Sequence, residues 1–196
     1  MATEEAPYTL VYESGDFEIR DYESHILAET IVDGTLEDAG NKAFRRLFNY
    51  ISGANHSRSS ITMTAPVSQE PSGEKIRMTA PVSQQQAAEK WAVSFMMPTN
   101  YTLATLPIPD DNSIILRQVP AQRVAAVRYS GFWSESRFLR YKQQLEHWIK
   151  ENNLKIIGAP VWARYNPPFT FWFLRRNEIL IPISTDSNIS QPAIRP

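Results

Sequence analysis

Apolar and polar residues alternate along several stretches of the chain with the period of two that is typical of β-strands. The first stretch, YTLVYESGDFEIRDYESHILAETIV at residues 8–32, is rich in Tyr, Val, Ile and Thr and is interrupted by Ser14-Gly15-Asp16. Because Gly and Asp favour tight turns, it predicts a β-hairpin followed by another strand. Further strands are expected in residues 90–98, 114–131, 152–168 and 177–183.

Two other stretches have the 3.6-residue period of an amphipathic helix. In LEDAGNKAFRRLFNYI, residues 36–51, the apolar positions share one helical face, and Thr35 with Asp38 resembles a capping box at its start. A second helix is expected after Ser134, a plausible N-cap. Its apolar stripe consists of Phe138, Tyr141, Leu145, Trp148 and Ile149.

The order strands, helix, strands therefore occurs twice, which predicts an α+β fold with two helices on a largely antiparallel sheet. The proline-rich stretch at 100–113 is the expected boundary between the halves. We expect a flexible N-terminus at 1–6, a single domain at 7–183 and a disordered tail at 184–196. A chain of 196 residues with 42% hydrophobic content can bury one good core.

The composition of the chain argues against nucleic-acid binding, cysteine chemistry and a membrane span. The formal net charge of −1 gives no overall field toward nucleic acids, and Cys 0 excludes disulfides and thiolate chemistry. No apolar run approaches the roughly 18 residues of a membrane span, and the first residues lack a signal-peptide pattern, so we expect a cytoplasmic protein. The oligomeric state stays open.

Candidate catalytic and metal-binding residues are few. The chain has no Gly-x-Ser-x-Gly elbow, no Gly-rich phosphate loop and only three histidines without spaced partners, which argues against zinc hydrolases and nucleotide binders. His25, on a predicted strand, and His56, in a polar loop, are either ordinary histidines or metal ligands.

The first predicted helix has an apolar arc wider than one core contact needs. Phe44 and Phe48 extend it toward the polar edge that carries Asn41 and Arg45. The two rings either pack against a loop or form one wall of an apolar ligand pocket with basic side chains at its rim.

Two nearly identical heptapeptides, ITMTAPV at 61–67 and IRMTAPV at 76–82, are joined by SQEPSGEK. As neighbouring strands ended by their prolines, they would point Met63 and Met78 inward. A methionine there either fills an irregular core or lines a site for a flat aromatic ligand, and its thioether is also a possible haem-iron ligand.

These motifs, together with FEIRDY, NYISGAN, YSGFW and ARYNPP followed by RRNEILIPI, resemble the SOUL haem-binding protein family in order from about Phe17 to Ile183. The resemblance implies a distorted antiparallel β-barrel flanked by two helices and built from two similar halves. It also implies non-covalent binding of haem or another porphyrin, with Phe44 and Phe48 at the expected apolar wall of the cleft.

Two positions depart from the family pattern. Where some members have a proposed axial histidine after the motif arginine, this chain has Asp21, and two basic pocket positions correspond to Asn41 and Asn49. Neighbouring Lys42, Arg45 and Arg46 are the substitutes for pairing with propionates. We therefore expect an apolar cleft with a cationic rim that binds porphyrins as carrier, buffer or sensor.

Two alternatives remain. One is an enzyme that acts on a bound tetrapyrrole or a hydrolase like members of the GyrI-like group, for which Glu178 or Asp21 would supply the acidic group. Glu178 is otherwise expected to pair with Arg175 or Arg176. The other alternative is an interaction module without a physiological haem ligand.

Overall fold

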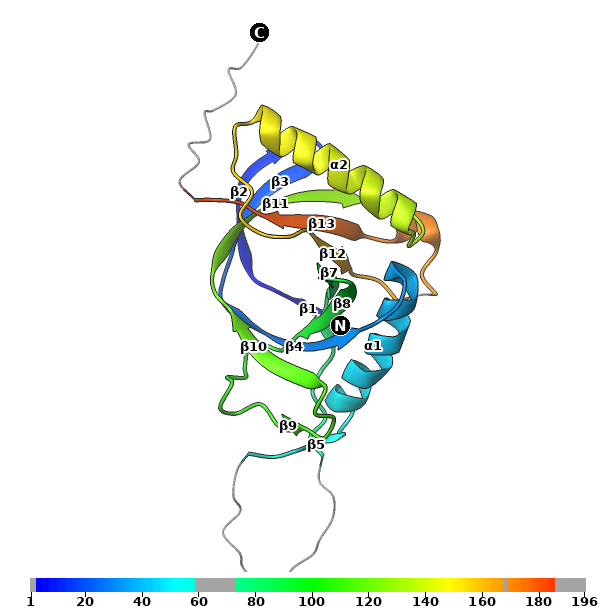
Figure 1. Ribbon diagram of the computed structural model, residues 1–196. Coiled ribbons are helices and arrows are strands. Elements are labelled where there is room, and N and C mark those ends of the chain that lie inside the picture. Colours follow the sequence, from blue (N-terminus) through cyan, green and yellow to red (C-terminus); the bar gives the residue numbers. More distant parts are fainter. Residues whose placement is uncertain (1–2, 59–72, 168, 186–196) are drawn as a thin grey trace, which may run out of the picture. The chain divides into compact units, whose positions relative to one another are not determined.

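The computed structural model describes residues 3–58, 73–167 and 169–185, with two compact units. Unit 1 contains the described residues of 3–6 and 24–120, and unit 2 contains those of 7–23 and 121–185. Each unit has one α-helix packed against antiparallel strands (Figure 1). The α+β prediction is confirmed, whereas closure into a barrel, the similarity of the two halves and their union in one domain stay predictions.

Unit 1 is built on a four-stranded antiparallel sheet in the order β10-β4-β8-β7. Its strands are β4 (His25–Val32), β7 (Val82–Ala87), β8 (Lys90–Met96) and β10 (Ile114–Val119). Helix α1 (Leu36–Ile51) packs on β4 and β8, and its bounds agree with the sequence prediction. Three residues after β4, Asp33, Gly34 and Thr35, are enough to bring the chain back over the same sheet.

The core of unit 1 lies between α1 and this sheet. The buried helix positions include those that the 3.6-residue period selects: Leu36, Ala39, Ala43, Leu47, Tyr50 and Ile51. They meet the buried residues of the sheet, among them Ala28 of β4 and Val93 and Phe95 of β8. Small Ala39 and Ala43 let the helix approach the sheet closely, so the burial fixes how α1 presents its opposite face to solvent.

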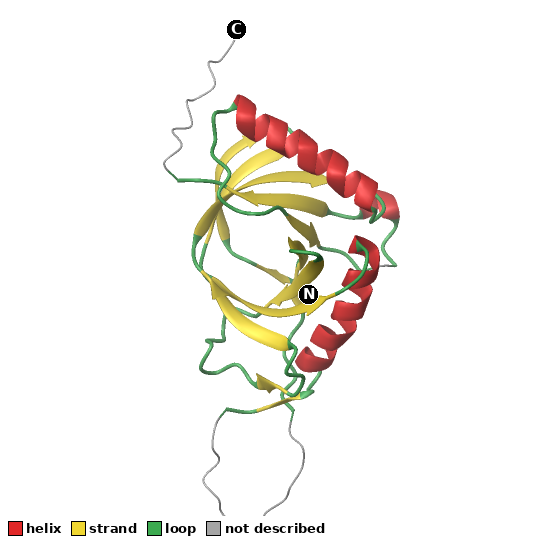
Figure 2. Ribbon diagram, in the orientation of Figure 1, coloured by secondary structure: helices red, strands yellow, loops and turns green. Residues whose placement is uncertain are grey.

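Unit 2 is built on a five-stranded antiparallel sheet in the order β12-β13-β11-β3-β2. Its strands are β2 (Tyr8–Ser14), β3 (Phe17–Tyr22), β11 (Gln122–Tyr129), β12 (Val161–Arg164) and β13 (Asn177–Pro182). Helix α2 (Glu135–Glu151) starts at the predicted cap Ser134 and packs on β11 and β13 (Figure 2). A 3-10 turn, η1 (Trp172–Leu174), precedes β13.

Short strands complete the described elements. β1 (Glu4–Glu5) pairs in parallel with β6 (Thr79–Ala80), and β5 (Asn55–His56) pairs with β9 (Ile108–Pro109). The Glu4 carboxylate also accepts hydrogen bonds from the backbone N–H and the hydroxyl of Thr99. The flexibility of residues 1–6 stays a prediction.

The predicted boundary at 100–113 is wrong by one strand. Unit 1 extends to Pro120 because β10 pairs with β4, so that Ile114 lies opposite Thr30 and Val119 opposite His25. The N-terminal hairpin of β2 and β3, although predicted correctly as a hairpin, belongs to unit 2 because β3 pairs with β11. Strand pairing between distant segments, which local patterns do not encode, decides both assignments.

Candidate functional site

A groove of about 500 Å³ lies in unit 1 along the solvent-facing side of α1. The end of β4 and the polar face of the helix form its walls. The lining residues are Ile31, Val32, Asp33, Asn41, Lys42, Arg45, Arg46 and Asn49. The groove therefore joins a small apolar floor to a rim with three cations.

The turn between β4 and α1 positions this groove. Gly34 adopts a φ of 130°, a conformation that disfavours other residues, so the chain turns sharply into the helix. The Thr35 hydroxyl accepts a hydrogen bond from the Asp38 N–H at 3.2 Å and donates to the Asp38 carboxylate at 3.0 Å, which confirms the predicted cap. The Lys42 ammonium lies 3.5 Å from where a Cβ on Gly34 would be, and so covers the turn.

The charged side chains of the groove differ in whether they have partners. Arg46 reaches Ser113 at 3.5 Å, and its charge adds to hydrogen bonds from Ser113 that lower the pKa of Asp111. Asp33, the acidic residue of the lining, forms an ion pair with Lys90 at 3.2 Å, which offsets its charge. Within the described part of the chain, no carboxylate pairs with Arg45. The groove is thus suited to an anionic group.

Beside the groove, α1 carries a stacked aromatic pair. The rings of Phe44 and Phe48 lie 5.8 Å apart at 13°. Phe44 is half-buried and meets the core residue Phe95 edge-on at 5.3 Å, whereas Phe48 is 45% exposed. The inner ring anchors the pair and the outer ring offers an apolar surface to solvent.

The structure brings together only some of the residues that the sequence suggested. Asn41 and Arg45 line the groove, together with the substitutes Lys42 and Arg46. Phe44 and Phe48 are not among its lining residues. Arg45 precedes Phe48 by three positions, which makes these two residues neighbours on the helix surface. Their role in ligand binding stays a prediction.

Met78 does not face inward as predicted. Its side chain is 37% exposed, while Thr79, expected to point outward, is buried and donates a hydrogen bond to the Met96 carbonyl. The alternation fails because only Thr79 and Ala80 of this heptapeptide before Pro81 belong to a paired strand. Met63 lies outside the described residues.

The two candidate histidines lie away from the groove lining. His25 is half-buried at the start of β4, opposite Val119. His56 is exposed on β5, with its Nδ1 3.1 Å from a carboxylate oxygen of Asp110. Among the residues that the structure describes, no three His, Cys, Asp or Glu side chains group as metal ligands.

Sequence reasoning missed the part of the groove that β4 supplies, namely Ile31, Val32 and Asp33. A signal was present in IVDGT, residues 31–35, since a strand that ends three positions before a helix cap must leave its last side chains beside the first turns of that helix. The same residues predict the start of the helix from Thr35 alone, without the strand beside it.

Unit 2 holds the carboxylates considered for hydrolysis. Glu178 pairs with Arg176 at 2.9 Å, as predicted, and also with Arg20 at 2.7 and 3.0 Å, while Tyr165 donates to it at 2.8 Å. Burial raises the pKa of Glu178, but the hydrogen bonds and charges of Arg20 and Arg176 outweigh it and leave the pKa below its usual value.

Asp21 is held in a similar way. The Arg123 guanidinium donates two hydrogen bonds of 2.7 Å to its carboxylate and lowers its pKa. Both carboxylates therefore remain ionised with their oxygens occupied by arginine, which is unlike the raised pKa of a general acid.

Neither helix in the described parts of the chain is both long and apolar enough to cross a membrane.

Comparison with known proteins gives one family. The model described as SOUL heme-binding protein matches residues 3–182. No curated protein matches the chain.

Solved structures share the fold at low sequence identity. The C-terminal domain of EcmrR has a TM-score of 0.55 and 12% identity, over 90% of this chain and 98% of that one. A hydrolase from Listeria innocua has a TM-score of 0.58 and 10% identity, over 89% and 94% of the two chains. EcmrR in its complex with DNA has a TM-score of 0.59 and 15% identity, over 86% of this chain and 57% of that one.

Proposed function

The chain belongs to the SOUL heme-binding protein family, and on this premise we propose that it binds haem or a related tetrapyrrole non-covalently, as a carrier, buffer or sensor in the cytoplasm. The observation that carries the proposal is the pairing, on one helix, of a cation-rimmed groove with an exposed aromatic ring. A porphyrin with propionate groups has the complementary chemistry, a flat apolar macrocycle with two carboxylates at one edge.

The residues of α1 divide this task between them. Phe48, held in place by its stack on Phe44, offers a ring face to the macrocycle. Arg45 lies between this ring and the groove and has no carboxylate partner within the described residues, so its guanidinium is available for a propionate. Lys42 and Arg46 add positive charge on the same helix face, which favours a ligand with two carboxylates over one with a single carboxylate.

The surroundings of the groove suit iron-containing and iron-free ligands alike. Bound iron would accept an axial ligand and add redox chemistry, but His25 and His56 are not among the groove residues, and Asp21 is engaged by Arg123. Affinity that depends on the macrocycle and its propionates should differ little between haemin and protoporphyrin.

The arginine pairs of Glu178 and Asp21 favour binding over hydrolysis. A general base needs a carboxylate oxygen that is accessible to water or substrate, and Glu178 is 0% exposed with three partners. This is the reason for preferring a binding function to the hydrolase alternative.

The decisive experiment is a titration of the purified protein with haemin and, separately, with metal-free protoporphyrin. The Soret band and the tryptophan fluorescence report binding. We expect saturable binding of both ligands with affinities within about tenfold of each other, a difference of about 1.4 kcal/mol. A strong preference for haemin that is lost in His25→Ala or His56→Ala would point to axial ligation, and absence of any saturable signal would reject the proposal.

A further inference from the structure

Unit 2 carries a run of exposed apolar side chains between β12 and β13, which we call the aromatic loop. It spans Phe169–Leu174 and includes the 3-10 turn η1. Its exposed fractions are 86% for Phe169, 69% for Phe171, 47% for Trp172, 54% for Phe173 and 62% for Leu174. Single exposed apolar residues are ordinary, but five within six consecutive positions indicate a surface made to contact an apolar phase.

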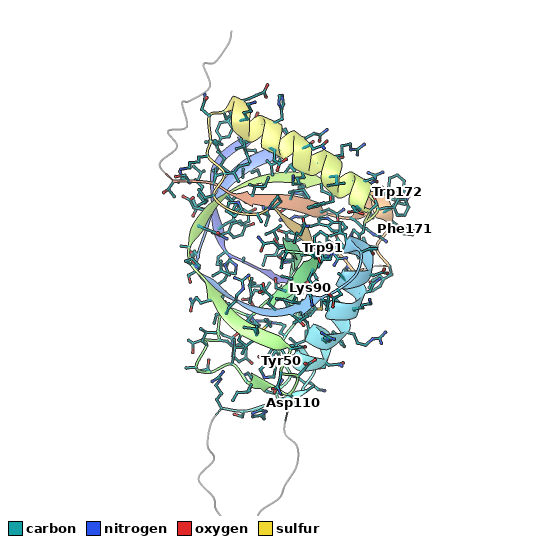
Figure 3. The ribbon with its side chains drawn as sticks, in the orientation of Figure 1. Tyr50, Lys90, Trp91, Asp110, Phe171 and Trp172 are labelled. Carbon is teal, nitrogen blue, oxygen red and sulfur yellow. The ribbon has the colours of Figure 1, made fainter. Side chains whose placement is uncertain are left out.

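Three of the four rings in this loop form one continuous cluster with Phe132. Phe171 stacks on Phe173 at 5.7 Å, and Phe173 meets Trp172 edge-on at 5.6 Å. Trp172 in turn stacks on Phe132 at 5.6 Å, a residue that is itself 54% exposed and precedes α2. Phe171 and Trp172 project outward from the ribbon (Figure 3). The contacts hold the rings side by side, so they can enter an apolar layer together with little loss of side-chain freedom.

Two arginines lie near the base of this cluster. Arg175 donates a hydrogen bond to the Thr170 carbonyl at 2.8 Å, and its guanidinium lies 6.0 Å from the ring centroid of Phe132. The Arg137 guanidinium, from the first turn of α2, lies beside the backbone of Gly131, the residue before Phe132. No Asp or Glu occurs in residues 161–177, and the acidic residue of the α2 first turn is Glu135. The loop thus combines apolar tips with a mainly cationic base.

From this arrangement we infer that the aromatic loop docks on an anionic lipid surface. Trp and Phe side chains enter the boundary between headgroups and acyl chains, and arginines beside them bind lipid phosphates. A second copy of the chain is a poorer occupant, because a twofold contact would bring the arginines of both copies together. The inference is independent of whether the groove on α1 binds a tetrapyrrole.

The test is co-sedimentation of the purified protein with vesicles of phosphatidylglycerol and, in parallel, of phosphatidylcholine. The parent protein should bind phosphatidylglycerol vesicles several-fold more strongly, and about 0.5 M salt should remove most of this difference. The partition coefficient of the variant Phe171→Ser/Trp172→Ser should be at least tenfold lower. In the parent protein both rings move from water into the lipid, and the variant lacks this apolar burial. Ile115→Ser, another exposed apolar change but on β10 of unit 1, should bind vesicles as the parent does.

Circular dichroism checks that both variants remain folded. We expect them to, because the replaced side chains are exposed. Bromine-labelled acyl chains should quench the parent's tryptophan fluorescence and quench the double variant less. Failure of the parent to bind either vesicle overturns the inference, as does equal binding by the parent and the double variant. If sedimentation velocity shows a dimer that the double variant loses, the loop is instead a contact between copies, and the lipid proposal is rejected.

Discussion

Arg20 and Glu178 form a two-pronged ion pair inside unit 2, with N–O distances of 2.7 and 3.0 Å and side chains that are 1% and 0% exposed. Arg20 comes from β3 and Glu178 from β13, so the pair crosses the intervening strand β11. Glu18, Tyr22, Tyr165 and Arg176 complete the hydrogen bonding around it. Charges this deeply buried are tolerated only when every partner is present.

Removal of one member of this pair should be strongly destabilising. We expect Glu178→Gln to lower the free energy of unfolding by about 3–5 kcal/mol, because it leaves the Arg20 charge buried without its main counter-ion. Urea unfolding monitored by circular dichroism measures the change. The matched control is Glu29→Gln, which breaks the more exposed pair with Arg117 and should cost about 0.2–1 kcal/mol. Similar losses in the two variants would contradict this account.

The same pair should make stability depend on pH at the acidic end. The pKa of Glu178 in the folded protein lies below its ordinary value of 4.5, so between these two values the unfolded chain binds the additional proton. The contribution of Glu178 is therefore fully present well above pH 4.5 and is lost as the pH falls through its folded pKa. Asp21, whose pKa is also lowered, adds a contribution of the same sign.

Unfolding free energies measured between about pH 3 and 7 should thus fall toward low pH in the parent protein. Glu178→Gln should show a shallower decline, while Asp21→Asn should retain the part that depends on Glu178. If the free energy of unfolding of the parent protein rises as the pH falls through the range in which carboxylates ordinarily titrate, this linkage is refuted.

A third prediction concerns the cationic rim of the groove. Arg45→Gln should weaken the binding of protoporphyrin about two- to fivefold, the range expected for a charge contact at a solvent-exposed rim. The dimethyl ester of protoporphyrin lacks the carboxylates, and its affinity should be unchanged by the substitution. Arg77→Gln is the control, since Arg77 is an exposed arginine of unit 1 that pairs with Glu4. Equal effects of Arg45→Gln on the acid and the ester would remove the propionate role.

The aromatic pair of α1 gives a fourth prediction, in which stability and binding separate. Phe48→Ala should weaken porphyrin binding about three- to tenfold through lost ring stacking, while the free energy of unfolding changes by less than about 0.5 kcal/mol because the ring is exposed. Phe44→Ala should cost about 2 kcal/mol of stability, because its ring also packs on Phe95.

Fluorescence titration and urea unfolding of the same preparations measure both quantities for this pair. Phe171→Ala, which removes an exposed ring from unit 2, should leave porphyrin affinity unchanged. If Phe171→Ala weakens porphyrin binding as much as Phe48→Ala does, porphyrin affinity does not depend specifically on the Phe48 ring.

Local patterns predicted most of the elements and part of the site. The period of α1 gave its bounds and its buried face, and Thr35 and Ser134 were identified as caps because helix starts depend on neighbouring residues. Arg45 and Asn41 could be expected at a binding face for the same reason, since helical spacing alone places them together.

Features that depend on distant partners were beyond the local pattern. Met78 reads as an inward strand residue, but pairing of only Thr79 and Ala80 with β1 leaves it exposed. Glu178 was expected beside Arg176, two positions away, whereas its partner Arg20 lies at the other end of the chain. Ile31 and Val32 line the groove because α1 packs on β4, the strand that carries them, and this packing cannot be predicted from either segment alone.

The pairing of β3 with β11 has a consequence for how this protein forms on the ribosome. Arg20 lies opposite Val124, so the N-terminal hairpin leaves the exit tunnel long before the strand that it joins. The intervening segment can meanwhile assemble the sheet and helix of unit 1 from its own residues, because β4, α1, β8 and β10 are all synthesised by Pro120. The hairpin must wait with an unpaired edge during this interval, which makes the nascent chain, more than the finished protein, the form most exposed to aggregation.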